Sequence, residues 1–364
     1  MSFDFRFAST DDIDDLVELE RVCFTLDRLN QRNFSWMLSR ANAALIVVTS
    51  GAILCGYALV LFHRGTSLGR LYSIAVSPAW RGHELGQRLL EEAQACALAR
   101  NCAWLRLEVR ADNSAAIRLY EANGYQRFAS VEDYYEDHCE ALRYEKRILR
   151  ETPAPARQVP YYQQTTEFTC GAACLLMAMS AIDPTRAMTR AEEIQLWREA
   201  TTIFMTAGHG GCSPQGLALA AWRRGFDVRL EVSHAGSLFL HGVRSTEKKS
   251  IMKLVEDGFA QDLAATQVEQ VLGDYLQIGA ALAAGYKPLV LISSYRFIRL
   301  KAPHWVIITG CDEDFVYLHD PDVDHSKLKR GLDCQHLPVS HQEFLRMTVF
   351  GVQRVRAAVM LRCR

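Results

Sequence analysis

The chain has 364 residues, which is more than one ordinary hydrophobic core supports, so we expect two domains. Apolar residues make up 49% and charged residues 23%, as in soluble globular proteins. The net charge of −1 gives no basic surface for nucleic acids or anionic membranes, and we expect neither as a partner. The 11 cysteines are scattered without a CxxC pair, which predicts neither a metal site nor a disulfide framework. We therefore expect reduced thiols in the cytoplasm, and the oligomeric state stays open.

An almost continuous apolar stretch runs from Ala43 to Phe62 and is long enough to suggest a membrane span. Thr49, Ser50 and Gly51 interrupt it, and both halves are rich in Val, Ile and Leu. This pattern favours two buried strands joined by a tight turn over a transmembrane helix. The N-terminus is acidic and lacks the apolar segment of a signal peptide.

Strands and helices alternate along residues 1–150. Thr10 as N-cap, followed by Ile13, Leu16 and Leu19, gives the spacing of an amphipathic helix. The predicted order is a strand at 5–9, a helix at 10–24, the hairpin, a strand at 70–76, a helix at 85–101, a strand at 103–109 and a helix at 113–124. The alternation predicts an α/β domain.

A proline-rich segment at 151–160 predicts an extended linker to a second domain at 161–364. In that domain we expect helices after Cys170, at 191–202, at 214–224 and, with an interruption, at 262–285. Strands are predicted at 288–294, 304–310, 315–320 and 354–362. Helices followed by strands predict an α+β domain.

A loop between a predicted strand and a predicted helix is the first candidate site. The strand ends at Val76, and the loop carries Arg81 and Gly82 before a helix that begins near Leu85. Backbone N–H groups at such a helix start suit a pyrophosphate, and Arg81 adds a positive charge. Gly82 and Gly86 permit close approach of a ligand. Glycines also occur in ordinary loops, so the loop by itself leaves both interpretations open.

With the run NSAAIRLYEANGY, the first domain resembles the GNAT acetyltransferases, most closely their ribosomal-protein alanine N-acetyltransferase branch. The resemblance covers residues 3–148 in outline and implies a GNAT fold, with a mixed central sheet, that uses acetyl-CoA and no metal. The motif residues are Arg81 to Gly86, Asn113, Ala116, Tyr120, Gly124 and Tyr125. By this resemblance Tyr120 protonates the departing CoA thiolate and Glu108 is the base for the acceptor amine. The acetyl-CoA contacts that it implies are Ile74, Ala75, Val76, Arg81, Gly82, His83, Leu85, Gly86, Gln87 and Asn113.

One position departs from the family pattern, because Glu84 replaces the first glycine of the loop motif. A carboxylate beside a pyrophosphate is repelled unless its side chain turns to solvent. The structural alternatives are that Glu108 is a solvated strand residue and that Tyr120 is a buried aromatic residue.

The second candidate site combines residues from distant parts of the sequence. Cys170 begins a predicted helix, whose N-terminal dipole favours a thiolate. Gln164 lies upstream, where its amide can meet a developing oxyanion. His304 begins one apolar strand and Asp320 ends the next, as a base and its orienting partner would. Together these residues predict cysteine peptidase chemistry.

The spacing of the last two strands supports a His–Asp pair. If Cys311, Asp312 and Glu313 form a three-residue loop, Gly310 pairs with Asp314 and His304 lies opposite Asp320. Such partners have Cβ atoms about 5 Å apart. The alternatives are that Asp320 is only a turn residue before proline and that Cys170 is a small buried residue.

In these residues the second domain resembles the papain-like cysteine peptidases that process bacteriocin leader peptides, over residues 155–325 in outline. The resemblance implies that Cys170 attacks, His304 is the base, Asp320 orients it and Gln164 lines the oxyanion hole. Thr169 departs from the acidic residue that often precedes the family's cysteine. We expect Cys174 in the core, and His209 and Cys212 in a scaffold segment that borders the substrate cleft.

We therefore expect a bifunctional enzyme that acts on peptides, with an acetyl-CoA-dependent N-acyltransferase and a cysteine peptidase in one chain. Two alternatives stay open: a peptidase or peptide-binding protein whose GNAT half only docks or regulates, and a thiol acyltransferase or transpeptidase.

Overall fold

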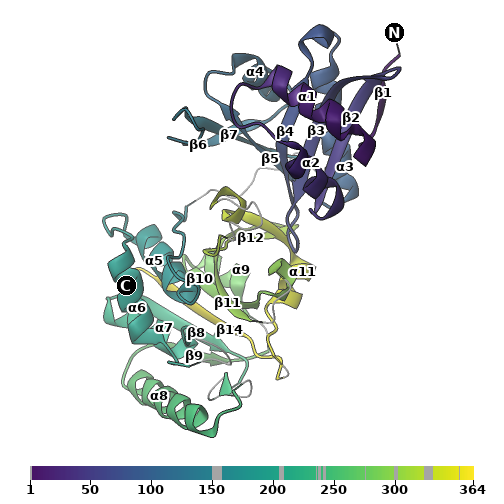
Figure 1. Cartoon of the computed structure of the whole chain (residues 1–364). Helices are drawn as coiled ribbons and strands as arrows, with labels where there is room; N and C mark the ends of the chain where they lie inside the picture. Colours follow the sequence, from purple (N-terminus) through teal and green to yellow (C-terminus); the bar gives the residue numbers. More distant parts are fainter. Residues whose placement is uncertain are drawn as a thin grey trace. The chain divides into compact units, whose positions relative to one another are not determined.

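The chain divides into two units in the computed structural model, Met1–Pro153 and Ala154–Arg364 (Figure 1). The structure describes residues 2–149, 158–204, 209–234, 236, 239–240, 243–274, 276–298, 302–323, 331–351 and 353–364. Most of the predicted linker at 151–160, namely 151–157, lies outside the described residues. Each unit contains its own sheet and its own hydrophobic core.

The N-terminal unit is built on a seven-stranded mixed sheet in the order β1-β2-β3-β4-β5-β7-β6. Its neighbouring strands are antiparallel except β4 and β5, which are parallel. The strands are β1 (Asp4–Phe7), β2 (Ala43–Ser50), β3 (Ile53–Phe62), β4 (Leu68–Val76), β5 (Trp104–Arg110), β6 (Gln126–Val131) and β7 (Ala141–Arg147). The helices are α1 (Ile13–Cys23), α2 (Gln31–Ser39), α3 (Leu85–Ala99) and α4 (Ser114–Ala122), with short 3-10 turns at Thr10–Asp12 and Pro78–Trp80.

Alternate side chains of the sheet enter two different cores. Val48 and Val60 pack with Leu89 of α3 on one face. Val47 and Leu59 pack with residues of α1 and α2 on the other face. The period of two along a strand therefore places helices on both faces, which explains why both strands of the hairpin are almost continuously apolar.

Several sequence-based predictions for this unit are confirmed and several are wrong. The hairpin, the strand at 70–76 and the helices near 85–101 and 113–124 are present. The first strand ends at Phe7 rather than at residue 9, and the N-cap is Ser9 rather than Thr10, because Ser9 and Asp12 form a reciprocal capping box. The elements α2, β6 and β7 were not predicted.

Strands β4 and β5 diverge beside the first candidate site. Their parallel pairing extends only from Leu68 to Leu71 of β4. A register shift against β3 leaves Tyr72 as an extra residue in β4, and such a bulge bends a strand. Beyond it β4 pairs with β3 as far as Val76, whereas β5 continues along β7. The backbone of β4 after Leu71 therefore has an open side.

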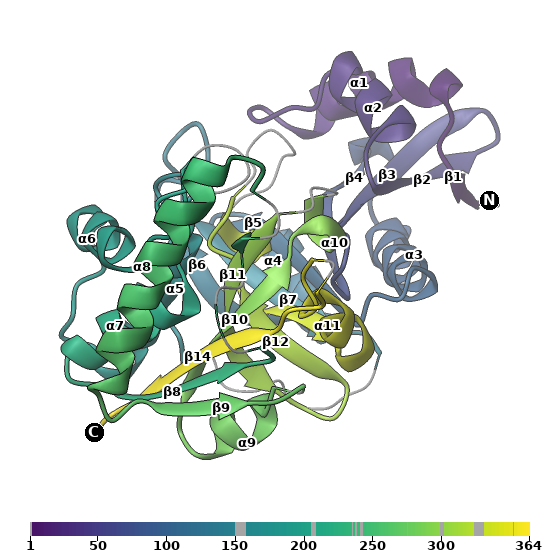
Figure 2. The ribbon, with the colours of Figure 1, turned by 90° about the horizontal axis from the view of Figure 1, so that it is seen from below.

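The C-terminal unit contains a second seven-stranded sheet in the order β13-β12-β11-β10-β14-β8-β9. The C-terminal strand β14 lies between β10 and β8 (Figure 2). The strands are β8 (Asp227–Val232), β9 (Glu269–Leu272), β10 (Lys287–Ser293), β11 (Pro303–Cys311), β12 (Phe315–His319), β13 (Leu337–Ser340) and β14 (Ala357–Arg362). The helices are α5 (Cys170–Ile182), α6 (Arg190–Ala200), α7 (Pro214–Arg223), α8 (Thr246–Ala264), α9 (Ile278–Ala283), α10 (Tyr295–Ile298) and α11 (His341–Met347).

Helix α5 packs on β10 and β11, and its sequence explains this central position. Its residues from Cys170 to Met179 are all buried, as expected for a helix that is apolar on every side. Helices α6 and α7 pack against α5, and α8 lies on α7. The α+β organisation is confirmed, and it anchors the first residue of α5 deep in the unit.

The predicted helix at 262–285 is wrong. The long helix of this region is α8, which ends at Ala264, and residues Glu269–Leu272 form the strand β9. Only α9 falls within the second part of the predicted range. Strands β8 and β13 were also not predicted. Within the described residues, no helix is both long and apolar enough to cross a membrane.

Candidate active sites

Cys170 is the first residue of α5 and its side chain is buried to 7% exposure. The N–H groups of the first turn have no partner within the helix, so their dipoles favour a negative charge at this position. His304 begins the apolar part of β11, and Asp320 follows directly after β12. Segments that are distant in the sequence thus meet at the N-terminus of α5.

His304 and Asp320 form a hydrogen-bonded ion pair. Nε2 of His304 lies 2.7 Å from Oδ1 of Asp320, and the two side chains are 12% and 4% exposed. The same Oδ1 accepts the backbone N–H of Asp322 at 2.9 Å. The carboxylate therefore fixes the orientation of the imidazole ring and leaves Nδ1 for another partner.

Cys170 lies close enough to His304 to raise the pKa of the imidazole. Burial lowers the pKa of His304, but the interactions with Asp320 and Cys170 outweigh burial. The pKa of His304 therefore lies well above its usual range. An imidazolium that persists at neutral pH stabilises a thiolate beside it.

The predicted register between the two strands is wrong, although the His–Asp contact is present. Ile307 pairs with His319 rather than with Tyr317, an offset of two residues. The turn lies further along the chain than predicted, since Cys311 pairs with Val316 and Oδ1 of Asp312 accepts the N–H groups of Asp314 and Phe315. A bulge after Ile308 absorbs one residue. The register of the two strands is therefore shifted by an even number of residues, so Asp320 stays on the same face of the sheet as His304.

Gln164 is attached through its backbone to the segment that follows Asp320. Its N–H donates to the carbonyl oxygen of Pro321 at 3.0 Å, and its side chain is buried. Nε2 lies 3.5 Å from Oδ1 of Asp322, a long contact, and Oε1 has no partner among the described residues. The amide is thus held near the triad without a strong hydrogen bond of its own.

Glu193 organises the segment before Cys170 and was not predicted from the sequence. This fully buried carboxylate on α6 accepts hydrogen bonds from the backbone and side chain of Thr165 at 2.9 and 2.7 Å. It also accepts from Thr169 at 2.5 Å and from Tyr162 at 3.0 Å. Its signal in the sequence was a charge at helical spacing from the buried Leu196 and Ala200.

Cys212 and Trp305 pack against Gly171, the residue that follows Cys170. A Cβ on Gly171 would lie 2.9 Å from Cβ of Cys212 and 3.0 Å from Cδ1 of Trp305. Trp305 donates its indole N–H to the carbonyl oxygen of Cys212 at 3.1 Å. Cys174 and Cys212 are buried, and burial raises the pKa of each thiol well above its usual range.

In the N-terminal unit, the open side of β4 and the start of α3 frame the first candidate site. Ile74, Ala75 and Val76 belong to the part of β4 that pairs only with β3. The loop residues Arg81, Gly82 and His83 are exposed. Leu85, Gly86 and Gln87 form the first turn of α3. Asn113 is the N-cap of α4 and accepts the N–H of Ala116 at 3.1 Å.

Glu84 precedes α3 in the left-handed conformation, with φ of 59°. This conformation favours glycine and explains physically why glycine suits this position of the loop. The Glu84 side chain is exposed to solvent, as required if an anion binds beside it.

Glu108 is bound by an arginine that the sequence analysis did not identify. Nε and Nη2 of Arg70 lie 2.9 and 2.7 Å from Oε2 of Glu108, and the side chains are 3% and 7% exposed. Burial raises the pKa of Tyr120, so its hydroxyl stays protonated. Burial also raises the pKa of Tyr135, and both Glu108 and Tyr120 add to that shift.

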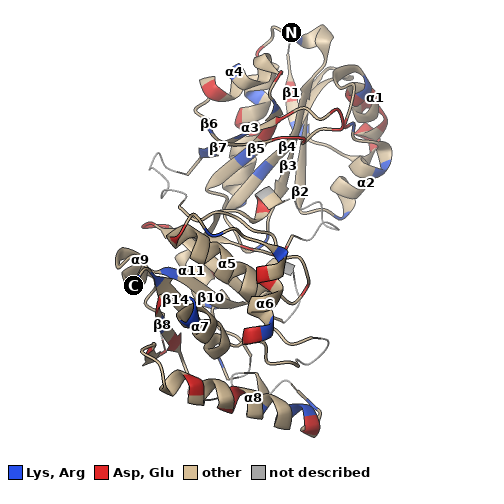
Figure 3. Cartoon of the chain, turned by 90° about the vertical axis from the view of Figure 1, so that its left-hand side faces the viewer, with Lys and Arg blue, Asp and Glu red and all other residues tan. Residues whose placement is uncertain are grey.

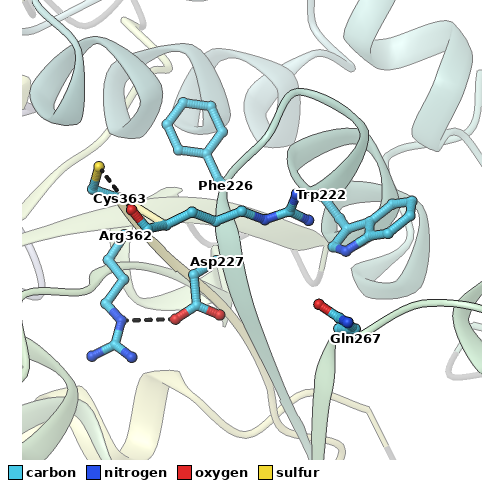
Figure 4. A pocket seen from close by; sticks show the side chains of 7 residues that line it. Trp222, Phe226, Asp227, Gln267, Arg362 and Cys363 are labelled. Carbon is cyan, nitrogen blue, oxygen red and sulfur yellow. Dashed lines mark hydrogen bonds and ion pairs between the residues drawn. The ribbon is translucent and has the colours of Figure 1, made fainter.

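A pocket of about 540 Å³ lies at the end of β14 and contains none of the predicted site residues (Figure 4). Arg362 points to Asp227 on its wall, with Nε and Oδ2 2.8 Å apart. The lining residues are Trp222, Phe226, Asp227, Gln267, Arg362, Cys363 and Arg364. The pocket is separate from the triad and gives no functional assignment.

Comparison with known proteins finds a family match for each unit. Residues 159–362 match the Peptidase_C39 like family, and residues 13–125 match the Acetyltransferase (GNAT) family. The bovine thialysine N-epsilon-acetyltransferase is 29% identical over 149 residues, which are 40% of this chain and 85% of that protein. The N-alpha-acetyltransferase RimI of Mycobacterium tuberculosis is 38% identical over 93 residues, which are 24% of this chain and 54% of that protein.

Among solved structures, the ribosomal-protein-S18-alanine N-acetyltransferase from Escherichia coli matches with 23% identity and a TM-score of 0.38. The match covers 43% of this chain and 99% of that one. Because the first family match spans more than half of the sequence, the chain belongs to the Peptidase_C39 like family. It joins this C-terminal domain to an N-terminal GNAT acetyltransferase domain.

Proposed function

We propose that this chain is a bifunctional enzyme that acts on peptides, with a cysteine peptidase and an acetyl-CoA-dependent N-acetyltransferase. The observation that carries the peptidase half is the hydrogen bond of His304 to Asp320 at 2.7 Å, with Cys170 close enough to raise the pKa of the same imidazole. A random arrangement of a cysteine, a histidine and an aspartate would not produce this contact at the start of a helix.

In the peptidase reaction, the Cys170 thiolate attacks the carbonyl carbon of a peptide bond. The oxyanion that forms accepts a hydrogen bond from Nε2 of Gln164, whose long contact to Asp322 is readily exchanged. His304 then gives its proton to the departing amine, and Asp320 keeps the ring oriented throughout. Water, activated by His304, releases the acyl group from Cys170.

In the acetyltransferase reaction, the loop from Arg81 to Gly86 and the first turn of α3 would hold the pyrophosphate of acetyl-CoA. The open side of β4 offers backbone groups to the pantetheine arm. Acetyl-CoA supplies the activated acetyl group when bound. Glu108 accepts the proton of the acceptor amine through Oε1, since Arg70 occupies Oε2. The protonated hydroxyl of Tyr120 donates to the departing thiolate.

The test uses the full-length protein with a peptide library and acetyl-CoA, and mass spectrometry reads cleavage and acetylation together. Cys170→Ala is expected to lower cleavage by roughly 1,000-fold or more, because the nucleophile is lost, and to leave acetylation in place. Tyr120→Phe is expected to lower acetylation by roughly 100-fold and to leave cleavage in place.

Cleavage that survives Cys170→Ala would refute the peptidase assignment. Absence of acetylation in the wild type would leave the N-terminal domain as a binding module. A parallel reaction with an added amine shows whether the acyl-enzyme is captured by water or by the amine.

A further inference from the structure

The sheet of the N-terminal unit has a charged layer at the N-terminal site. Arg106 and Glu108 of β5 lie opposite Glu145 and Arg143 of β7 in the register, and Arg70 of β4 lies beside Arg106. Period-two alternation puts all of these side chains on one face of the sheet. Figure 3 shows basic residues in blue within the strands of this unit. The other face carries the apolar core with Leu105 and Leu107.

The charges in this layer do not balance. Arg70 is paired with Glu108, and Nε of Arg106 lies 3.0 Å from Oε2 of Glu145. Arg143 has no ion pair among the described residues, and its Nε is buried without a hydrogen-bond partner. These five side chains therefore contain one guanidinium more than they have carboxylates.

The environment of Arg143 is unfavourable for a free cation. Burial, with smaller contributions from Arg106 and Arg70, lowers the pKa of Arg143 to about 10, against the opposing effects of Glu108 and Tyr134. A partly buried charge without a partner lowers the stability of the folded protein. A structural role alone gives no reason to keep it, whereas an anionic ligand would satisfy it.

The position of Arg143 determines which ligand can reach it. Arg143 is the cross-strand partner of Glu108, so their Cβ atoms lie about 5 Å apart. The aspartates at the far end of β5 are already paired, because Arg110 binds both Asp112 and Asp137 at 2.9 Å. If the amine of an acceptor contacts Glu108, the acceptor atoms that are only a few bonds from this amine would lie next to Arg143.

We propose that Arg143 binds a carboxylate of the acetyl acceptor, close to the amine that receives the acetyl group. The inference rests on the proposed acetyltransferase function. A guanidinium is suited to this task, because its planar donors match a carboxylate bidentately. The carboxylate comes either from an acidic side chain next to a peptide N-terminus or from the α-carboxylate of a free amino acid.

The experiment measures acetylation by the full-length protein with matched acceptors. One pair consists of peptide amides that begin Ala-Glu or Ala-Gln, and the other consists of alanine and alanine amide. We expect the wild type to prefer the acidic member of one pair by about 10- to 100-fold in kcat/KM, mainly through KM. The pair that shows the preference identifies the source of the carboxylate.

Arg143→Met is expected to reduce that preference to about twofold or less, and Arg143→Lys to retain part of it, because a point charge remains. Arg127→Met is the matched control, since this half-exposed arginine lies on the neighbouring strand β6 and outside the site. This variant is expected to leave kcat/KM unchanged for every acceptor. Circular dichroism checks that each variant is folded.

Equal use of acidic and neutral acceptors by the wild type would overturn the inference and leave the acetyltransferase function standing. A preference that survives Arg143→Met would overturn it too. If the wild type acetylates no acceptor, the proposed acetyltransferase function fails, and this inference fails with it.

Discussion

At the scale of single residues, Glu193 accepts hydrogen bonds that fix the segment before Cys170. Its carboxylate accepts hydrogen bonds from residues on both sides of Gln164 and from Thr169, which precedes Cys170. It thereby sets the positions of the proposed oxyanion donor and of the start of α5.

Glu193→Gln replaces one carboxylate oxygen by an amide N–H group that faces other donors. We expect it to lower the free energy of unfolding by about 1–3 kcal/mol, measured with urea, and to slow peptide cleavage. Glu192→Gln on the same helix is the control. Glu192 pairs with Arg224, and this arginine keeps its second partner, Glu199, in the variant. Its expected effect is at most about 1 kcal/mol. Equal effects of the two variants would contradict the positioning role of Glu193.

Glu84 is strained in the acetyl-CoA loop because a non-glycine residue adopts a positive φ there. We expect Glu84→Gly to raise the free energy of unfolding by roughly 1 kcal/mol. The variant also removes a negative charge beside the expected pyrophosphate, so calorimetry should show tighter binding of acetyl-CoA. Weaker binding by Glu84→Gly would show that the loop does not hold the pyrophosphate.

The sequence predicts the individual residues of the triad better than their surroundings. Cys170 at a helix start and His304 at a strand start are visible as polar residues at the ends of apolar runs. Glu193 is not visible in this way, because α6 also carries other charges, and Arg70 is not visible because it lies inside β4 rather than at the end of an apolar run. Their partners come from distant parts of the chain, and spacing along the sequence does not reveal them.

At the scale of elements, the start of α5 is packed so closely that it excludes a side chain at Gly171. We expect Gly171→Ala to lower the free energy of unfolding by about 1–3 kcal/mol, because a Cβ would overlap Cys212 and Trp305. It should also slow cleavage by displacing Cys170.

Gly279→Ala in α9 is the control, because no atom lies within 4 Å of its added Cβ. It should stabilise by up to about 1 kcal/mol through helix propensity. A neutral or stabilising effect of Gly171→Ala, measured by urea denaturation, would contradict the packing described at the nucleophile.

Helix α8 contributes a pH-dependent term through Glu256. This buried carboxyl accepts a hydrogen bond from Ser213 at 3.2 Å, and burial raises its pKa from 4.5 to about 7. Between pH 4.5 and about 7, Glu256 is therefore protonated in the folded state and ionised in the unfolded state. The stability that this carboxyl contributes to the folded state is fully present below pH 4.5 and is lost as the pH rises through about 7.

We expect Glu256→Gln to remove this dependence. Relative to wild type, the free energy of unfolding of the variant should rise by up to about 3 kcal/mol between pH 4.5 and pH 8, measured by urea denaturation. Asp257→Asn, on the exposed side of α8, should show no comparable change. A constant difference between Glu256→Gln and wild type would refute the role assigned to Glu256.

Strands that are long apolar runs were predicted from the sequence, and strands with charged residues were not. The hairpin β2–β3 and the strands β10 to β12 are long apolar runs. Strands β6 and β8 carry charged residues and become strands through pairing with β7 and β14. The wrong helix at 262–285 arose because alanine-rich sequence favours helix, whereas β9 forms by parallel pairing with β8.

At the scale of the whole molecule, the two family matches fall on separate structural units, and each unit carries one candidate site. Cys170, His304 and Asp320 all belong to the C-terminal unit, and Glu108 and Tyr120 belong to the N-terminal unit. Each chemistry can therefore be removed by substitution within its own unit. The division was predictable because sequence composition and two unrelated motif sets change at the same place.

The measurement that tests the central claim most directly is alkylation of the full-length protein by iodoacetamide at pH 6.5, with each thiol followed by mass spectrometry. An ordinary thiol is about 1% ionised at this pH, and the exposed Cys363 serves as the internal reference. If His304 holds Cys170 as a thiolate, Cys170 reacts at least about 10-fold faster than Cys363, and His304→Gln abolishes this advantage. If Cys170 reacts no faster than Cys363, or keeps its advantage in His304→Gln, the thiolate–imidazolium pair does not exist.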